Sequence, residues 1–184
     1  MWTRVLPLAG SMHLTRLAFG GWVMGWVWET TVFAGLVVGF ATGLRSMTAM
    51  AVLCWFAYLG KLMVASSWAG WTARLWVAIL FTVLAVGEYV ADKLPQVPSR
   101  TAPGPLAARV VLGGLAGAIV ATAMRASVLA GVLPGAIGAV AGAFAGHFVR
   151  SRRAKSGGAD WPVAVAEDFV AVGIAVWALV SVIG

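Results

Sequence analysis

The chain has 184 residues, of which 61% are hydrophobic and only 10% are charged, and its mean hydropathy is +0.94. So little polar material cannot cover a soluble domain, and we therefore predict an integral membrane protein with one compact membrane domain. The formal net charge of +7 indicates basic cytoplasmic loops and contact with anionic lipid headgroups, because no polar basic domain exists to bind nucleic acid.

Residues 1–29 are predicted to be an interfacial or disordered leader that precedes a single transmembrane domain over residues 30–184. They carry positive charge and some apolar residues, but no signal-peptide core with a cleavage site. The tryptophans of "GGWVMGWVW" are typical of the membrane–water interface. Because the well-patterned chain begins near Thr30, a start of translation at Met24 is an alternative.

Six apolar segments are candidate membrane spans, since a helix needs about 20 apolar residues to cross the hydrocarbon. In chain order they are 30–44, 47–64, 71–92, 106–129, 134–149 and 161–183. The first and fifth are short, so we expect them to be tilted, extended or partly re-entrant. We expect a tight turn at 44–47 and polar connections at "KLPQVPSRTAPGP" and "RSRRAKSGGAD". The predicted fold class is all-α, a polytopic transmembrane helix bundle.

The placement of lysine and arginine predicts the orientation of these spans. With six spans, more basic residues fall on the side that carries "RSRRAK" (150–155) than on the other side. The positive-inside rule then makes that side cytoplasmic and places both termini on the opposite side. We expect a multi-pass protein of a bacterial inner membrane.

Glycine recurs at every fourth position in three of the segments: Gly35, Gly39 and Gly43; Gly113 and Gly117; Gly138, Gly142 and Gly146. Small residues at this spacing let helix backbones approach closely in lipid, so we expect packing stripes. A glycine-lined path with exposed backbone is the alternative. The stripes also offer surfaces for a homo-oligomer, which so small a bundle would need in order to enclose a path.

The two halves of the chain share short similar strings. "ATGLRSM" (41–47) resembles "ATAMRAS" (121–127), and "AVGEYVA" (85–91) resembles "AVAEDFVA" (164–171). Each half would hold three spans, and an odd number inverts the second half, as in many transporters. The alternative is chance similarity, because short Ala/Val/Gly strings recur in any membrane protein.

Four carboxylates lie in or at the ends of the apolar segments: Glu88, Asp92, Glu167 and Asp168. A charge at the bilayer centre costs about 2.5–3.5 kcal/mol, so such residues face the bundle interior and find partners. Arg45 is the expected counter-ion, with Glu88 or Glu167 as its partner. The pair is either a structural ion pair or a site that binds and releases a proton, an ion or a headgroup.

Ser46 and Thr48 can cap the second segment, and the free N–H groups at a helix N-terminus suit an anion. With Arg45 beside that terminus, we expect a binding site for a phosphate or a carboxylate. The predicted substrate- or ion-binding residues are Arg45, Ser46, Thr48, Glu88, Asp92, Lys93, Ser99, Arg100, Glu167 and Asp168.

Metal and cofactor sites are not predicted. The single cysteine, Cys54, lies in an apolar segment, and His13 and His147 are far apart, so no metal-ligand spacing occurs. The chain has neither an HExxH nor a GxSxG motif, and we expect it not to be an enzyme.

Three stretches resemble a family of bacterial membrane proteins called domain of unknown function 4126 (DUF4126). They are "GLRSMTAMAV" (43–52), "GEYVADKLPQVPSRTAPGPLAARVVLGGLAGA" (87–118) and "AEDFVAV" (166–172). The resemblance implies a G-L-R-S/P turn, an E-x-x-x-D-K-[LI]-P motif, an S-R-T loop and a late E-D pair, but it supplies no activity.

The charged segments favour a small-solute or ion transporter. Glu88 or Glu167 would carry the coupling proton, and Arg45 with the second helix would contact the anion. The alternative is a non-transporting membrane scaffold or assembly factor, whose buried ion pairs serve folding alone.

Overall fold

The computed structural model describes the backbone of residues 9–91, 102–155 and 160–183, and the side chains of residues 25–91, 102–152, 166 and 168–183. Regular structure in these ranges is helical, as predicted. The helices are α1 (Ala9–Leu44), α2 (Ser46–Tyr58), α3 (Leu75–Ala91), α4 (Pro103–Ala123), α5 (Val128–Lys155) and α6 (Asp160–Ile183), with a 3-10 helix η1 (Trp68–Ala73) between α2 and α3.

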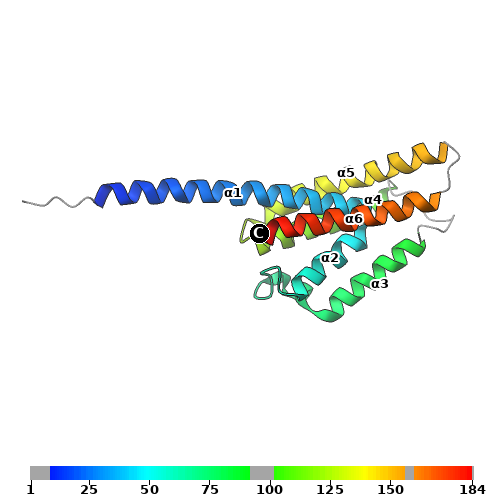
Figure 1. Ribbon diagram of the computed structural model, residues 1–184, viewed down its shortest axis with the longest axis horizontal. Coiled ribbons are helices and arrows are strands. Elements are labelled where there is room, and N and C mark those ends of the chain that lie inside the picture. Colours follow the sequence, from blue (N-terminus) through cyan, green and yellow to red (C-terminus); the bar gives the residue numbers. More distant parts are fainter. Residues whose placement is uncertain (1–8, 92–101, 156–159, 184) are drawn as a thin grey trace, which may run out of the picture.

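Four helices, α1, α4, α5 and α6, run side by side along the long axis of the molecule, and α2 and α3 form a hairpin inclined against them (Figure 1). Successive helices alternate in direction. The α1–α2 turn therefore lies at the same end as the last residues of α3 and α5 and the first residues of α4 and α6 (Figure 1). We call this the Arg45 end. The α4–α5 turn, η1 and the last turn of α6 lie at the opposite end.

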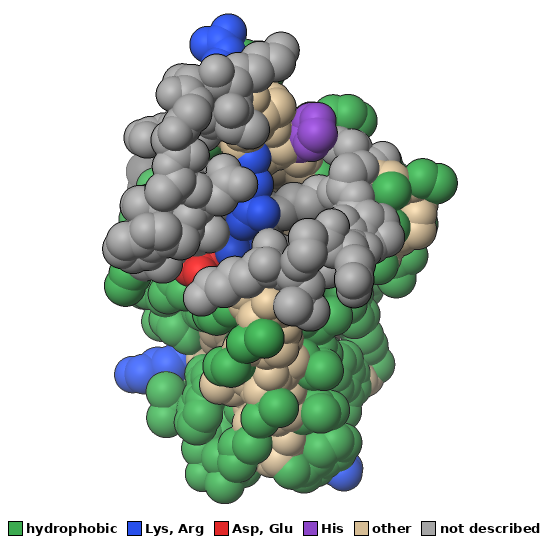
Figure 2. Space-filling view, turned by 90° about the vertical axis from the view of Figure 1, so that its right-hand side faces the viewer, with side chains coloured by type: hydrophobic (Ala, Val, Ile, Leu, Met, Phe, Trp, Pro, Cys, Tyr) green, Lys and Arg blue, Asp and Glu red, His purple; other side chains and the backbone are tan. Residues whose placement is uncertain are grey.

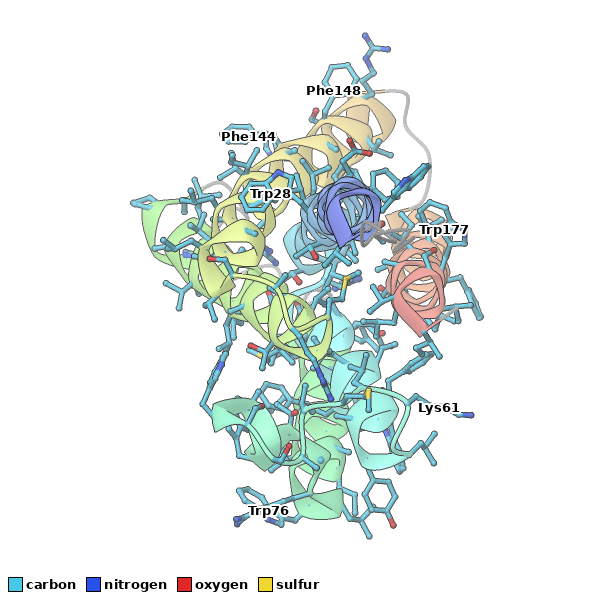
Figure 3. The ribbon with its side chains drawn as sticks, turned by 90° about the vertical axis from the view of Figure 1, so that its left-hand side faces the viewer. Trp28, Lys61, Trp76, Phe144, Phe148 and Trp177 are labelled. Atoms are coloured by element: carbon cyan, nitrogen blue, oxygen red, sulfur yellow. The ribbon has the colours of Figure 1, made fainter. Side chains whose placement is uncertain are left out.

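Among the residues whose side chains the structure describes, three helical stretches are long and apolar enough to cross a membrane: Gly25–Leu44, Pro103–Ala123 and Val128–Arg152. Three further apolar stretches are shorter: Ser46–Tyr58, Leu75–Ala91 and Asp168–Ile183, the last being the part of α6 with described side chains. Large apolar side chains are exposed on the outside of the bundle, among them Trp28, Trp76 and Trp177, which project away from the helices (Figure 3). These features are those of a membrane protein, whose outer surface faces lipid rather than water.

Several predicted span boundaries differ from the helix boundaries: α4 ends at Ala123 rather than residue 129, α3 begins at Leu75 rather than residue 71, α2 ends before residue 64, and α1 begins before residue 30. The second segment ends at Tyr58 instead of residue 64 because Gly60 adopts a left-handed conformation, φ 70°. There the Lys61 N–H donates to the Phe56 carbonyl (2.9 Å) and the Gly60 N–H to the Ala57 carbonyl (3.1 Å), the hydrogen bonds of a Schellman cap. The first helix begins at Ala9, so residues 9–29 are helical and continuous with the span that follows.

The fifth segment differs most from the prediction. We expected it to begin at Pro134 and to be short, but α5 begins at Val128 and has 28 residues, with Pro134 inside the helix. A proline there removes one backbone hydrogen bond and usually kinks or ends a helix. Packing on both sides favours the continuous helix, because Gly131 and Gly135 on either side of Pro134 contact neighbouring helices directly.

The glycine stripes are packing surfaces, as predicted. A Cβ atom added to Gly39 of α1 would overlap the carbonyl of Gly135, and one added to Gly117 of α4 would overlap the carbonyl of Gly131. The α1–α5 and α4–α5 interfaces are accordingly the most extensive in the bundle. These glycines let backbones touch within one chain.

The inverted repeat is not confirmed by the packing. Helices α4 and α5 pack along their lengths, whereas their counterparts α1 and α2 share a small interface. An inverted repeat would also place the 167–168 pair beside Arg125. Instead Asp168 contacts Arg45, and Arg125 is exposed in the turn that connects α4 and α5.

Candidate functional site

Arg45 forms the whole connection between α1 and α2. Its backbone is extended, with φ −144° and ψ 102°, so α1 ends at Leu44 and α2 begins at Ser46 with a sharp change of direction. The predicted tight turn is thereby confirmed. A helix that starts this abruptly has N–H groups in its first turn that lack partners within the helix, and the Arg45 side chain does not cap them.

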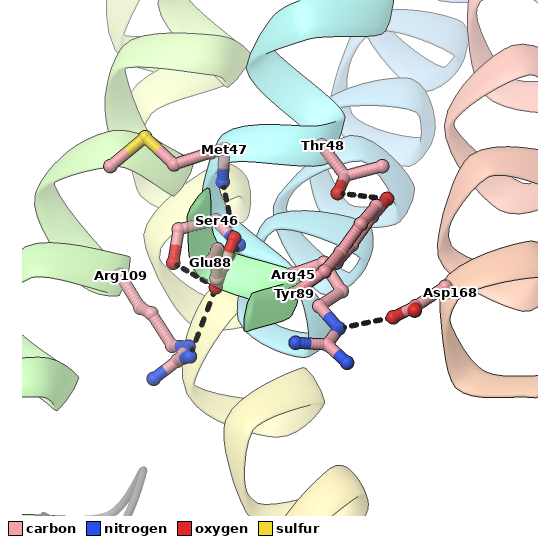
Figure 4. A network of polar contacts seen from close by, with 8 residues as sticks. All are labelled: Arg45, Ser46, Met47, Thr48, Glu88, Tyr89, Arg109 and Asp168. Atoms are coloured by element: carbon pink, nitrogen blue, oxygen red, sulfur yellow. Dashed lines mark hydrogen bonds and ion pairs between the residues drawn. The ribbon is translucent and has the colours of Figure 1, made fainter. Parts of the chain in front are cut away.

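The carboxylate of Glu88, from the end of α3, satisfies these N–H groups (Figure 4). The Ser46 N–H and Ser46 Oγ donate to Oε1, both at 3.2 Å, and the Met47 N–H donates to Oε2 at 3.0 Å. Arg109 Nη2 of α4 donates to Oε1 at 3.3 Å. A negative charge at this position interacts favourably with the helix dipole as well as with the guanidinium. Glu88 therefore occupies the anion-binding position that was predicted at the start of the second segment.

Arg45 pairs with Asp168 of α6, at 2.5 Å between Nε and Oδ1 (Figure 4). The Arg45 guanidinium carbon also lies 5.1 Å from the centre of the Tyr89 ring, a cation–π geometry. Arg45 is 1% exposed, so its charge is removed from solvent and depends on these partners. The predicted partner was Glu88 or Glu167. That prediction was wrong for Glu88, which the structure pairs with Arg109, and the side chain of Glu167 lies outside the described residues.

Thr48 does not cap α2 as expected. Its hydroxyl is 2.7 Å from the Tyr89 hydroxyl, and this hydrogen bond holds the aromatic ring next to Arg45. Asp92, Lys93, Ser99 and Arg100, which complete the predicted set, lie outside the described residues. The structure thus brings together Arg45, Ser46, Thr48, Glu88 and Asp168 from that set.

Two residues of the cluster were missed by sequence reasoning. Arg109 falls within the fourth predicted span (106–129) but was not proposed as a site residue, although it is the only charged residue within Pro103–Ala123. Tyr89 was overlooked although it follows Glu88 directly. A basic residue inside an otherwise apolar helix was the available signal, since such residues need a partner in lipid.

The cluster is recessed from the Arg45 end. Arg109 comes six residues after the start of α4 and Asp168 eight residues after the start of α6, which correspond to about 9 Å and about 12 Å along the helices. Figure 2 looks onto this end and shows basic side chains in the middle of the face, with hydrophobic side chains on the flanks below. The charges thus lie within the bundle but near one of its ends.

Comparison with known families identifies the chain. The model of the domain of unknown function family DUF4126 matches residues 32–181. The chain belongs to the DUF4126 family. No curated protein and no solved structure gives a significant match.

The matched part of this DUF4126 protein contains every described residue of the cluster. Among these, two guanidinium groups, of Arg45 and Arg109, face two carboxylates, of Glu88 and Asp168. The described charges therefore balance. Such a cluster can hold the helices in one fixed arrangement. Alternatively, it can exchange one carboxylate for another anion when that carboxylate takes up a proton.

Proposed function

We propose that this DUF4126 protein is a multi-pass transporter of a small anion in a bacterial inner membrane. Six crossings, one for each helix from α1 to α6, would use the alternating helix directions seen in Figure 1. The two shorter helices, α2 and α3, would complete their crossings with the connections that adjoin them, whereas α6 has 24 residues. The basic end of α5 would face the cytoplasm.

The position of Glu88 supports transport of an anion. Its carboxylate lies where a helix N-terminus, a hydroxyl group and a guanidinium converge. These are the groups that proteins use to bind phosphate or carboxylate ligands. In the structure Glu88 itself fills that position, so a substrate anion binds there only after the Glu88 side chain has left or lost its charge.

Charge balance then links anion entry to proton uptake. An unbalanced charge inside the membrane is costly, so adding one anion to the neutral cluster favours adding one proton. Protonation of Glu88 removes one negative charge and weakens its hold on Arg109 and the N-terminus of α2. An anion and a proton would then move together, with Arg45 and Asp168 kept as a fixed pair.

A second candidate, a scaffold or assembly factor that transports nothing, is favoured by one observation. Glu88 connects α2, α3 and α4, and the Arg45–Asp168 pair connects the α1–α2 turn to α6. Buried ion pairs of this kind fix a helix arrangement without any ligand. Loss of one partner would then impair folding, and exchange of the two charges would restore it.

Proton-coupled flux distinguishes the two candidates. Purified protein in liposomes that contain a pH-sensitive dye would be exposed to inward gradients of inorganic phosphate and chloride. Transport predicts internal acidification with one of these anions, and loss of the acidification in Glu88→Gln, which still purifies as a folded protein. Glu29→Gln is the matched control, because Glu29 is an exposed carboxylate of α1.

The scaffold candidate predicts no flux from the wild type with any anion in that assay. It also predicts that Asp168→Arg and Arg45→Asp each lower the yield of folded protein, and that the double exchange restores it. Absence of flux together with restored yield would overturn the transport proposal.

A further inference from the structure

A hollow of about 300 Å³ lies between α1, α5 and α6. Its walls include Phe40 and Leu44 of α1, Gly146 and Val149 of α5, and Ala166 and Val170 of α6. The hollow exists because α5 and α6 contact each other far less than either of them contacts α1. Its volume is at the lower end of the range for small-molecule sites.

The walls are apolar, and small residues create the space. Gly146 and Ala166 carry little or no side chain, so they leave the space between α5 and α6 unfilled. Large apolar side chains are exposed on the same two helices: Phe144, Phe148 and Val149 of α5 and Phe169 and Val170 of α6 are each at least half exposed. Phe144 and Phe148 project outward from α5 (Figure 3). Exposed apolar groups around a groove mark a surface that an apolar partner covers.

Basic residues follow directly on α5 beyond this groove. After Val149 the helix continues with Arg150 and Arg152, and its sequence adds Arg153 and Lys155 with no acidic residue over the whole of Val128–Lys155. The Arg152 guanidinium carbon lies 4.3 Å from the centre of the Phe148 ring, so an apolar ring and a positive charge adjoin at this end of α5. Long basic side chains at a helix end reach the headgroup layer and attract anionic lipids.

We propose that the α1–α5–α6 groove binds one diacyl lipid that has an anionic phosphate headgroup. One acyl chain lies in the apolar groove, and the phosphate lies beside the basic end of α5 that follows Val149. The combination of an apolar walled space and a positive helix end matches the two parts of such a lipid. Leu44 of the groove precedes Arg45, so the bound lipid lies next to the turn that carries the charged cluster but does not depend on transport by that cluster.

Native mass spectrometry of the purified, detergent-solubilised protein tests the site. Phosphatidylglycerol and phosphatidylcholine with identical acyl chains serve as probes, and glycerol phosphate serves as the headgroup alone. We expect at least fivefold greater retention of phosphatidylglycerol than of phosphatidylcholine. Equal retention of the two lipids would overturn the proposal, and binding of glycerol phosphate as strong as that of phosphatidylglycerol would assign the basic end of α5 to a free anion.

Variants separate the two parts of the site. Ala166→Trp fills the groove and should lower retention of both lipids at least fivefold, whereas Ala107→Trp, at an exposed position of α4, should not. Val170→Trp fills the groove from its outer wall and replaces Ala166→Trp if that variant does not fold. The double variant Arg150→Gln/Arg152→Gln should abolish the preference for phosphatidylglycerol and leave chain binding intact. Unchanged retention in a folded groove-filling variant would refute the proposal.

Discussion

Glu88 caps a helix to which it does not belong: its Oε2 accepts the Met47 N–H at 3.0 Å, and its Oε1 accepts the Ser46 N–H at 3.2 Å. The α1–α2 connection is a single residue, which leaves no room for a local cap. The carboxylate of α3 supplies the missing acceptor from 41 residues further along the chain. The Glu88 side chain therefore both caps the N-terminus of α2 and holds α3 against that helix.

Replacement of Glu88 should lower the free energy of unfolding by an amount that depends on whether the new side chain keeps an acceptor oxygen. Glu88→Ala leaves Arg109 and the first N–H groups of α2 without the carboxylate, and loss of one partner of a buried pair costs about 3–5 kcal/mol. Glu88→Gln keeps one acceptor oxygen, and we expect a loss of about 1–3 kcal/mol. Thermal unfolding of the purified protein in detergent measures both, with Glu29→Gln as the control. A Glu88→Ala variant as stable as that control would show that the cap is dispensable.

Arg45 and Asp168 should be energetically coupled. In a double-mutant cycle with Arg45→Gln and Asp168→Asn, we expect an interaction free energy of about 1–3 kcal/mol, because contacting residues are coupled in this range. The same cycle between Arg45→Gln and Glu88→Gln should give a clearly smaller value, since Glu88 pairs with Arg109 instead. Coupling that is stronger to Glu88 than to Asp168 would contradict the pairing in Figure 4.

The glycine interfaces should not accept even one added methyl group. Gly39→Ala and Gly117→Ala each place a Cβ against a backbone carbonyl of α5. Because backbone cannot move aside cheaply, we expect each variant to lose about 1–3 kcal/mol of stability. Gly87→Ala and Gly173→Ala are matched controls, since no atom lies within 4 Å of the added Cβ. Alanine is the better helix former, so the controls should be neutral or more stable by up to about 1 kcal/mol.

The proposed topology predicts where introduced cysteines can be labelled in intact cells. In a Cys54→Ala background, Ser66→Cys and Ser127→Cys lie at the opposite end from Arg45, and both positions are exposed. A membrane-impermeant maleimide should therefore label both from outside. Ser151→Cys, at the Arg45 end, should be labelled only after the membrane is permeabilised. Labelling of all three from one side would exclude six crossings.

Some properties follow from the residues in their local order. The apolar composition alone indicates a membrane protein, because such a chain cannot cover itself with polar groups. The glycine spacing in α1 and α4 predicts close helix contacts, and the polar "GLRS" within an apolar region predicts the turn at Arg45. These inferences need only local chemistry, and the structure bears them out. The left-handed Gly60 that ends α2 was also visible locally, as a glycine just beyond an apolar helix.

The tertiary structure alone decided which charges meet. Glu167 and Asp168 are adjacent in sequence and point about 100° apart on the helix, so the partner of Arg45 depends on how α6 is rotated against α1 and α2. Arg109 reaches Glu88 because α3 and α4 both pack against α2, which brings these two side chains together at its first turn. Pro134 remains inside α5 because contacts of Gly131 and Gly135 with α4 and α1 outweigh its local preference to end a helix. Each outcome depends on how helices far apart in sequence pack side by side, and local propensities carry no information about that packing.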